Sequence, residues 1–176
     1  MNQRILMREH DIDLALQRIA LQILENNSAA GRLALVGIHT CGVFLAQRLR
    51  TIIGEHFSHR VDYGTLDINL YRDDWSLVSQ NPVVRTTDIA FEVDGAHLLL
   101  VDDVIFTGRT IRAAMDAIMD YGRPKTVQLA VLADRGGREL PIQPDYTGLR
   151  AAILPDERIT VRLGGGEENV VVIESE

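Results

Sequence analysis

The sequence predicts an α/β fold in which a parallel sheet is covered by helices on both sides. Three short apolar runs, separated by patterns of helical spacing, carry this prediction. Continuous apolar runs of this length are typical of strands that are buried on both faces, as in parallel sheets. Strand and helix alternate through the middle of the chain, which favours a parallel sheet with crossover helices.

Length and composition indicate one domain over residues 1–176. The chain is 46% hydrophobic and 24% charged, which excludes a disordered or fibrous protein. No apolar run approaches the roughly 18 residues of a membrane-spanning helix. The first eight residues lack the apolar core of a secretory signal, so we expect a cytoplasmic protein without membrane contact. The lone Cys41 fits a reducing compartment and excludes a cysteine-based zinc site.

The first half of the chain predicts two helices, a buried strand and a second strand. Apolar residues at helical spacing predict a helix over residues 11–26, the run Leu33–Ile38 predicts a buried strand, and a second helix is expected over about 43–53. Alternation of Leu66, Ile68 and Leu70 with polar residues suggests another strand. The polar stretch 71–94 predicts a long loop or hairpin, and such excursions commonly act as lids beside a site.

The second half repeats the pattern and ends in a hairpin. A buried strand over 97–101 precedes an amphipathic helix, whose apolar residues run from Ile111 to Met119. A third buried strand is expected over 127–133. Glycines 164–166 separate two further apolar stretches, 158–163 and 170–173, as in a terminal hairpin.

The most informative stretch follows the strand at 97–101. Asp102 and Asp103 come at its carboxyl end, where ligands of open α/β sheets bind. Residues 107–110, Thr-Gly-Arg-Thr, then open a helix, and N–H groups at a helix N-terminus suit a phosphate monoester. Together they indicate a sugar phosphate site. The same residues would also serve to end a strand and cap a helix, and the spacing alone leaves both interpretations open.

Residues 101–110, Val-Asp-Asp-Val-Ile-Phe-Thr-Gly-Arg-Thr, resemble the phosphoribosyl pyrophosphate (PRPP) signature of the type I phosphoribosyltransferases. More narrowly, nearly the whole chain resembles the PyrR family, pyrimidine operon regulators that are also uracil phosphoribosyltransferases. The matching blocks are 36–40, 70–74, 101–110, 121–124 and 129–142. The resemblance implies the type I phosphoribosyltransferase fold: a central parallel sheet flanked by helices, a small hood from the chain ends and the tail, and a mobile loop at about 71–94.

The resemblance implies that uracil and PRPP are converted to UMP and pyrophosphate, with Mg²⁺ as the cofactor that carries the pyrophosphate. In this interpretation Asp102 and Asp103 hold the ribose hydroxyls, directly or through Mg²⁺. The implied residues for PRPP and its 5′-phosphate are Val104, Ile105, Phe106, Thr107, Gly108, Arg109 and Thr110. Purine-specific relatives carry Asp at the position of Phe106, so a purine substrate is disfavoured.

Three further blocks receive implied roles. The pyrophosphate loop is His39, Thr40, Cys41 and Gly42, although an ordinary strand-to-helix turn is the alternative. Many relatives have Arg in place of Cys41, so affinity for pyrophosphate is expected to be lower. Arg72 and Arg85 would reach the pyrophosphate from the mobile loop, and for Arg85 an exposed charge on a solvated hairpin is an equal alternative.

The base is expected to meet Asp134, Arg135 and Gly136, with a simple polar turn as the alternative. The neighbouring Arg138 and Glu139 are expected to pair with each other or with solvent.

The family's second role implies binding of pyrimidine-leader mRNA, and its members self-associate, so a homo-oligomer is expected. The net charge of −7 and the single basic residue Arg18 within 11–26 argue against a strong RNA surface. Gln143 and Gly137 fall where many relatives carry Arg and His. The basic residues that form either a local patch or scattered surface charge are Arg18, Arg123, Lys125, Arg138 and Arg150. The competing hypothesis is an RNA-binding attenuator that senses UMP or PRPP with little or no catalysis.

Overall fold

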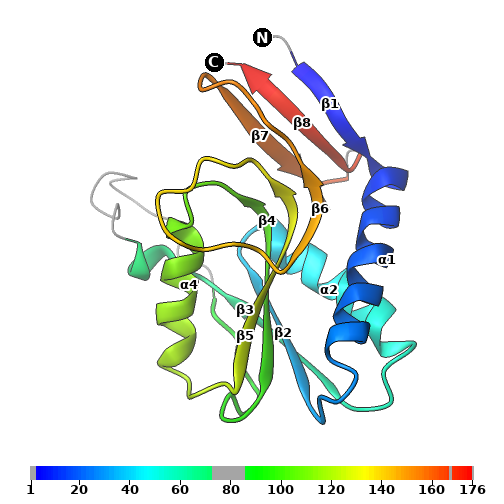
Figure 1. The fold of residues 1–176 in the computed structure, drawn as a ribbon, viewed down its shortest axis with the longest axis vertical. Coiled ribbons are helices and arrows are strands. Elements are labelled where there is room, and N and C mark those ends of the chain that lie inside the picture. The colour runs from blue at the N-terminus through cyan, green and yellow to red at the C-terminus, as the bar shows by residue number, and fades with distance from the viewer. Residues whose placement is uncertain (1–2, 73–85, 167, 176) are drawn as a thin grey trace.

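The structure is a computed structural model that describes residues 3–72, 86–166 and 168–175. Its centre is a sheet of five parallel strands in the order β3-β2-β4-β5-β6 (Figure 1). The strands are β2 (Leu33–Ile38), β3 (Val61–Leu66), β4 (His97–Ile105), β5 (Thr126–Asp134) and β6 (Tyr146–Arg150). The helices are α1 (Glu9–Asn26), α2 (Cys41–Gly54), the short 3-10 helix η1 (Asn69–Tyr71) and α4 (Arg109–Met119). The predicted α/β class with a parallel sheet is confirmed.

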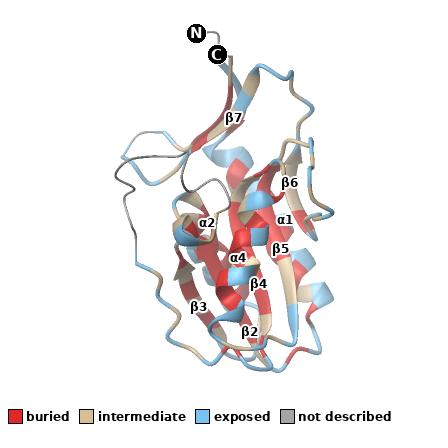
Figure 2. Ribbon diagram, turned by 90° about the vertical axis from the view of Figure 1, so that its left-hand side faces the viewer, coloured by how far each residue is buried: buried red, intermediate tan, exposed pale blue. Residues whose placement is uncertain are grey.

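Both faces of the sheet are covered by helices, which explains the continuous apolar runs. Successive side chains of a strand point to opposite faces. In β4, Leu99 and Val101 pack in one cluster with α1 and α2, whereas Leu98 and Leu100 pack in the other cluster with α4. The buried residues therefore follow one another along the central strands (Figure 2).

A separate antiparallel sheet joins the two ends of the chain. It has the order β1-β8-β7 and is formed by β1 (Gln3–Arg8), β7 (Glu157–Arg162) and β8 (Val170–Ser175). This hood sheet lies above the carboxyl end of the parallel sheet, next to the start of α1 (Figure 1). The predicted terminal hairpin is confirmed. Hydrophobic patterning did not predict β1, because one face of this strand is open to solvent and its exposed residues include Ile5.

The strand expected from Leu66, Ile68 and Leu70 is wrong in position. The strand is β3, which ends at Leu66, and Leu70 is 69% exposed. On the buried face of β3, Asp62 and Gly64 precede Leu66, so hydrophobic alternation along this face could not reveal the strand. The buried Asp62 carboxylate is neutralised by Arg32, 2.9 Å away, and Arg60, 2.5 Å away.

Element boundaries near the central motif also differ from expectation. The strand predicted to end at residue 101 continues to Ile105, so the acid pair lies within β4 rather than after it. Helix α4 begins at Arg109, and Gly108 precedes it with a φ of 92°. Within the predicted loop 71–94, residues 73–85 lie outside the described residues, and Asp88 forms an antiparallel bridge with Thr65. Over the described ranges, no helix has both the length and the hydropathy needed to cross a membrane.

Replacing Gly37 by Ala is expected to destabilise the fold. A Cβ at Gly37 would lie 2.6 Å from Val43 Cα and 2.7 Å from the Gly42 carbonyl oxygen, and backbone atoms cannot move aside cheaply. Overpacking of this kind costs about 1–3 kcal/mol. Urea unfolding should show this loss in the free energy of unfolding of Gly37→Ala. The matched control is Gly54→Ala, since a Cβ at that position would meet no described atom within 4 Å other than those of its chain neighbours and the adjacent backbone of α2. Equal stability of the two variants would contradict the described packing between β2 and α2.

Candidate functional site

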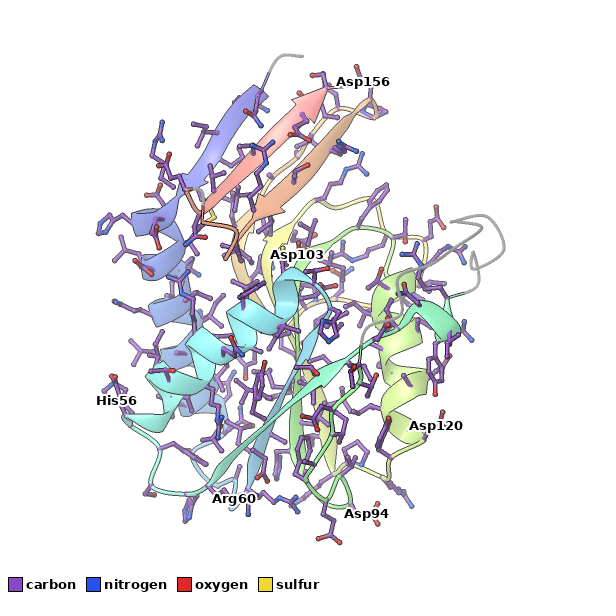
Figure 3. The ribbon with its side chains drawn as sticks, turned by 180° about the vertical axis from the view of Figure 1, so that it is seen from behind. His56, Arg60, Asp94, Asp103, Asp120 and Asp156 are labelled. Atoms are coloured by element: carbon purple, nitrogen blue, oxygen red, sulfur yellow. The ribbon has the colours of Figure 1, made fainter. Side chains whose placement is uncertain are left out.

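The candidate site lies where the strand order of the parallel sheet reverses. From β2 the chain moves to β3 on one side, and then returns to place β4 on the other side. In open α/β sheets, ligands bind at the carboxyl ends of the strands at such a switch point. Asp103 lies at this end of β4, on the side of the hood sheet, whereas Arg60 and Asp94 lie at the opposite end (Figure 3).

A cavity of about 320 Å³ lies at this end of β4, at the N-terminus of α4. It brings together Arg72 and all the residues predicted for the 5′-phosphate. Its lining residues are Arg72, Val104, Ile105, Phe106, Thr107, Gly108, Arg109, Thr110, Ile111 and Glu139. Amide groups and the positive end of a helix dipole make such a position suitable for an anion. The sequence-predicted phosphate segment therefore surrounds one hollow.

Local hydrogen bonds shape the entry into α4. The Arg109 amide donates to Thr107 Oγ1 at 3.3 Å, and the Arg112 amide donates to the Gly108 carbonyl at 3.0 Å. The positive φ of Gly108 is one that other residues rarely adopt, so glycine is favoured at this turn. A tight turn followed by a helix is thus built into the Thr-Gly-Arg-Thr sequence.

Glu139, which the sequence predicted to pair with Arg138 or with solvent, lines the cavity. Its Oε2 lies 2.7 Å from Nε of Arg109, so this carboxylate contacts a cation of the predicted phosphate site. No spacing in the sequence indicates this contact, because 30 residues separate the two partners. The expected pairing of Arg138 with Glu139 or solvent is wrong: the Arg138 side chain turns inward, and its Nη2 lies 2.9 Å from Asp134 Oδ2.

The acid pair lies beside the cavity but is not part of its lining. Asp102 is only 5% exposed, and its Oδ1 accepts a hydrogen bond of 2.9 Å from the Asp103 amide. Asp103 is half-buried, and its Oδ1 accepts from the Val104 amide at 2.9 Å. Burial, and then the neighbouring Asp103 carboxylate, raise the pKa of Asp102 well above its ordinary value. Asp103 is the more accessible of the two carboxylates.

The loop His39–Gly42 packs directly against the end of β4. A Cβ at Gly42 would overlap the Val101 carbonyl oxygen and lie 3.1 Å from Asp102 Cα, so glycine is required for this approach. The His39–Thr40 peptide is cis, and His39 Nε2 lies 3.1 Å from the Thr86 carbonyl oxygen. The predicted pyrophosphate loop is therefore adjacent to the acid pair.

Cys41, which begins α2, is half-buried between this loop and the hood. Its Sγ lies 3.5 Å from the Val161 carbonyl oxygen, and it lines a hollow of about 240 Å³ with hood residues. Burial raises the pKa of the Cys41 thiol to about 11, and the Asp103 carboxylate adds to the increase. The thiol is thus held in its protonated form.

The block predicted to bind the base follows β5, the neighbour of β4. The Asp134 side chain stabilises the turn that follows β5, because its Oδ1 accepts a hydrogen bond of 2.9 Å from the Gly136 amide. The Arg135 guanidinium stacks on the Phe106 ring at 3.7 Å from the ring centroid. All three predicted residues line a hollow of about 370 Å³ with Arg150, Ala151 and Ala152. This hollow lies beside the cavity at the N-terminus of α4, since the Arg135 amide donates to the Ile105 carbonyl, which lines that cavity.

Two of the basic residues considered for an RNA surface are engaged within the molecule. Arg18 donates to the carbonyl oxygens of Thr147 and Gly148 at 3.1 and 2.6 Å. The Arg138 side chain is only 12% exposed. Gly137 adopts a φ of 76°, and a Cβ there would lie 2.6 Å from the Phe106 ring, so a residue with a side chain at this position would require the ring to move.

Known proteins are similar to this chain in sequence and in fold. Residues 3–164 match the family model described as the phosphoribosyl transferase domain. The chain is 51% identical over 171 residues to the "Bifunctional protein PyrR" of Syntrophobacter fumaroxidans, covering 96% of this chain and 92% of that protein. Identity to the protein of the same name from Pelotomaculum thermopropionicum is 53% over 163 residues, covering 92% and 90%.

Solved structures of phosphoribosyltransferases have the same fold at low sequence identity. A point mutant of the hypoxanthine phosphoribosyltransferase of Trypanosoma cruzi, in a ternary complex with substrates, matches with a TM-score of 0.74 at 20% identity, covering 97% of this chain and 95% of that one. A hypoxanthine-guanine phosphoribosyltransferase from Bacillus anthracis matches with a TM-score of 0.70 at 16% identity, covering 98% of each chain. The fold is therefore the type I phosphoribosyltransferase fold. With the family match over most of its length and about half of its residues shared with two PyrR proteins, the chain belongs to the phosphoribosyltransferase family and, within it, to the PyrR group.

Proposed function

We propose that the chain transfers the 5-phosphoribosyl group of PRPP to uracil, giving UMP and pyrophosphate, and that it regulates pyrimidine biosynthesis genes. The observation that carries the proposal is the PRPP signature folded around the cavity at the N-terminus of α4, beside the acid pair and the loop 39–42. The similarity to proteins named bifunctional PyrR supports both roles.

In the proposed reaction, the bond between the ribose C1 and the pyrophosphate oxygen breaks, and a bond from C1 to the uracil nitrogen forms. The electron pair of the broken bond leaves with pyrophosphate, and uracil reacts as its anion after its N1 proton has passed to water. The transition state resembles an oxocarbenium ion, so catalysis depends on positioning and electrostatics. The backbone amides at 107–110 hold the 5′-phosphate, and Asp103 and Asp102 hold the ribose hydroxyls.

The donor set fits Mg²⁺, which phosphoribosyltransferases generally use with PRPP. Mg²⁺ is usually bound through one or two carboxylates together with substrate oxygens. Asp103 and Asp102 offer two adjacent carboxylates at the end of β4. When bound, the ion would neutralise charge on the departing pyrophosphate.

The pyrophosphate would lie against the loop 39–42, where the shorter, uncharged Cys41 stands in place of the Arg of many relatives. Arg72, which was predicted to reach the pyrophosphate, lines the cavity assigned to the 5′-phosphate. Arg85, predicted for the same role, lies outside the described residues. The base would contact Asp134, Arg135 and Gly136, and the Phe106 ring stands where purine-specific relatives carry a carboxylate.

For regulation, we propose that a pyrimidine nucleotide in the same site controls binding of leader mRNA by a homo-oligomer. The internal contacts of Arg18 and Arg138 reduce the cations available to phosphates, and the net charge is −7. The RNA contact would therefore depend on few basic residues.

The double variant Asp102→Asn, Asp103→Asn is expected to lose UMP formation by at least about 10²-fold, because charge stabilisation at the reacting sugar disappears. The assay follows UMP from uracil, PRPP and Mg²⁺. Asp156→Asn, an exposed carboxylate at the far end of the hood (Figure 3), is the matched control and should retain wild-type turnover. Wild-type turnover by the double variant would contradict the role of the acid pair. Folded wild-type protein that binds UMP and leader RNA but makes no UMP would favour the attenuator without catalysis.

Asp102→Asn alone is expected to stabilise the unliganded protein, increasingly so as pH rises. The folded-state pKa of Asp102 is raised, so its contribution to stability is fully present below the ordinary value of 3.8 and is lost as pH rises through the folded-state pKa. Asn keeps an oxygen for the Asp103 amide and carries no charge. Thermal unfolding at pH 5, 6.5 and 8 should show a difference in Tm, variant minus wild type, that grows with pH. A difference that shrinks would show that Asp102 is stabilised as its anion.

Cys41 is expected to resist alkylation at neutral pH. With a pKa of about 11 it is far less ionised at pH 8 than a free thiol of pKa about 8.5, so iodoacetamide should react about 10²-fold more slowly. Mass spectrometry of the native protein should show a rate that still rises above pH 9. The urea-unfolded chain supplies the comparison with an ordinary thiol. A native rate that reaches its plateau by pH 9 would show that the thiol is not buried beside Asp103.

A further inference from the structure

The side chain of Arg138 connects the two loops that form the candidate site. Its Nη1 donates to the Phe106 carbonyl at 2.9 Å, and its Nη2 donates to Asp134 Oδ2 at 2.9 Å. Its Nε donates to the Ile142 carbonyl at 2.9 Å, and Nη2 also lies 3.3 Å from Gln143 Oε1. The side chains of Arg138 and Asp134 are only 12% and 11% exposed. The guanidinium is therefore held by four acceptors inside the protein.

The two residues after Arg138 also bind to the turn that precedes α4. The amides of Glu139 and Leu140 both donate to the Thr107 carbonyl, at 3.0 and 3.1 Å. A Cβ at Gly108 would lie 3.5 Å from the Cβ atoms of Leu140 and Ile142, so this segment packs against the turn before α4. Two consecutive carbonyls, those of Phe106 and Thr107, are thus held by residues 138–140.

Fixing these carbonyls also fixes two amide groups. In a planar trans peptide the C=O and the following N–H point in opposite directions. The Phe106 carbonyl faces Arg138, so the Thr107 N–H points away from Arg138. The Thr107 carbonyl faces the amides of Glu139 and Leu140, so the Gly108 N–H points away from them. Thr107 and Gly108 both line the cavity at the N-terminus of α4.

We propose that Arg138 is a positioning residue for the phosphate site: by holding the Phe106 carbonyl and Asp134 together, it aims the Thr107 amide at the 5′-phosphate and ties this turn to the loop that binds the base. The inference rests on the proposed function, because it assigns the cavity to the 5′-phosphate. Arg138 contacts no substrate in this role. It acts through the peptide between Phe106 and Thr107.

Arginine suits this role better than lysine. The planar guanidinium presents N–H groups in fixed directions, and here three of its nitrogens donate to three different acceptors. A lysine ammonium retains the charge opposite Asp134, but it is a compact group on a flexible stem. It cannot reproduce this set of contacts, so Arg138→Lys preserves the buried charge pair while releasing the Phe106 carbonyl.

The test compares the affinities of the full chain for UMP and for inorganic pyrophosphate by calorimetry. UMP carries the 5′-phosphate, whereas pyrophosphate is assigned to the loop 39–42 on the other side of the acid pair. In Arg138→Lys, the Kd for UMP should rise about tenfold while the Kd for pyrophosphate stays within about twofold of wild type. Arg138→Met should weaken UMP binding further, and its loss of charge leaves Asp134 buried without this cation, so Arg138→Lys carries the test if Arg138→Met fails to fold.

Arg112→Met is the matched control, because Arg112 lies on α4 and forms an exposed pair with Asp116 at 3.0 Å. It should bind UMP like wild type. Folded Arg138→Lys that binds UMP with wild-type affinity would overturn the inference, as would an equal loss of UMP and pyrophosphate affinity. Wild-type protein that binds no UMP would instead overturn the proposed function, and with it the inference.

Discussion

The parallel pairing of β2 with β4 determines where everything else at the site lies. This pairing sets the loop 39–42 beside Asp102, and the missing side chain of Gly42 lets the two backbones touch. The neighbouring pair β4 and β5 brings residues 134–136, the segment predicted to contact the base, to the same edge, where the Arg135 amide donates to the Ile105 carbonyl. Segments that lie far apart in the chain therefore meet at the carboxyl ends of three adjacent strands, where amides, carboxylates and cations lie close together.

The buried carboxylate of Asp102 lowers the stability of the folded protein when it is ionised. Asp102 is a buried carboxylate beside a second carboxylate, and both conditions disfavour its ionised form. Other acids inside this molecule are neutralised: Asp62 by Arg32 and Arg60, and Asp134 by Arg138. Among these three acids, the one that lacks an ion pair within the described residues belongs to the PRPP signature. This contrast is typical of functional sites, where groups are positioned for a ligand rather than for the empty protein.

Much of the fold could be predicted from the sequence, but not all of it. Strands β2, β4 and β5 were predicted because both of their faces are apolar. Strands β3 and β1 were missed or misplaced because Asp62 and Gly64 occupy the inward face of β3 and β1 has an open face. At the site, the segment 104–110 was predicted from one local motif and does surround one cavity. Glu139 and Arg138 were assigned wrong partners, because their contacts cross 30 or more residues to Arg109 and Phe106 and follow no local spacing.

The sequence by itself determined the α/β class, the PRPP signature and its family, because these depend on local periodicity and on short motifs read in order. Only the tertiary structure decided which polar or charged group each charged side chain contacts. It placed the Arg138 side chain inside the protein beside Asp134, attached Arg18 to the carbonyls of β6, and buried Asp102 next to a second carboxylate. Hydrophobic patterning records which residues leave water. The partner of each polar group depends on the distances that packing sets between remote segments.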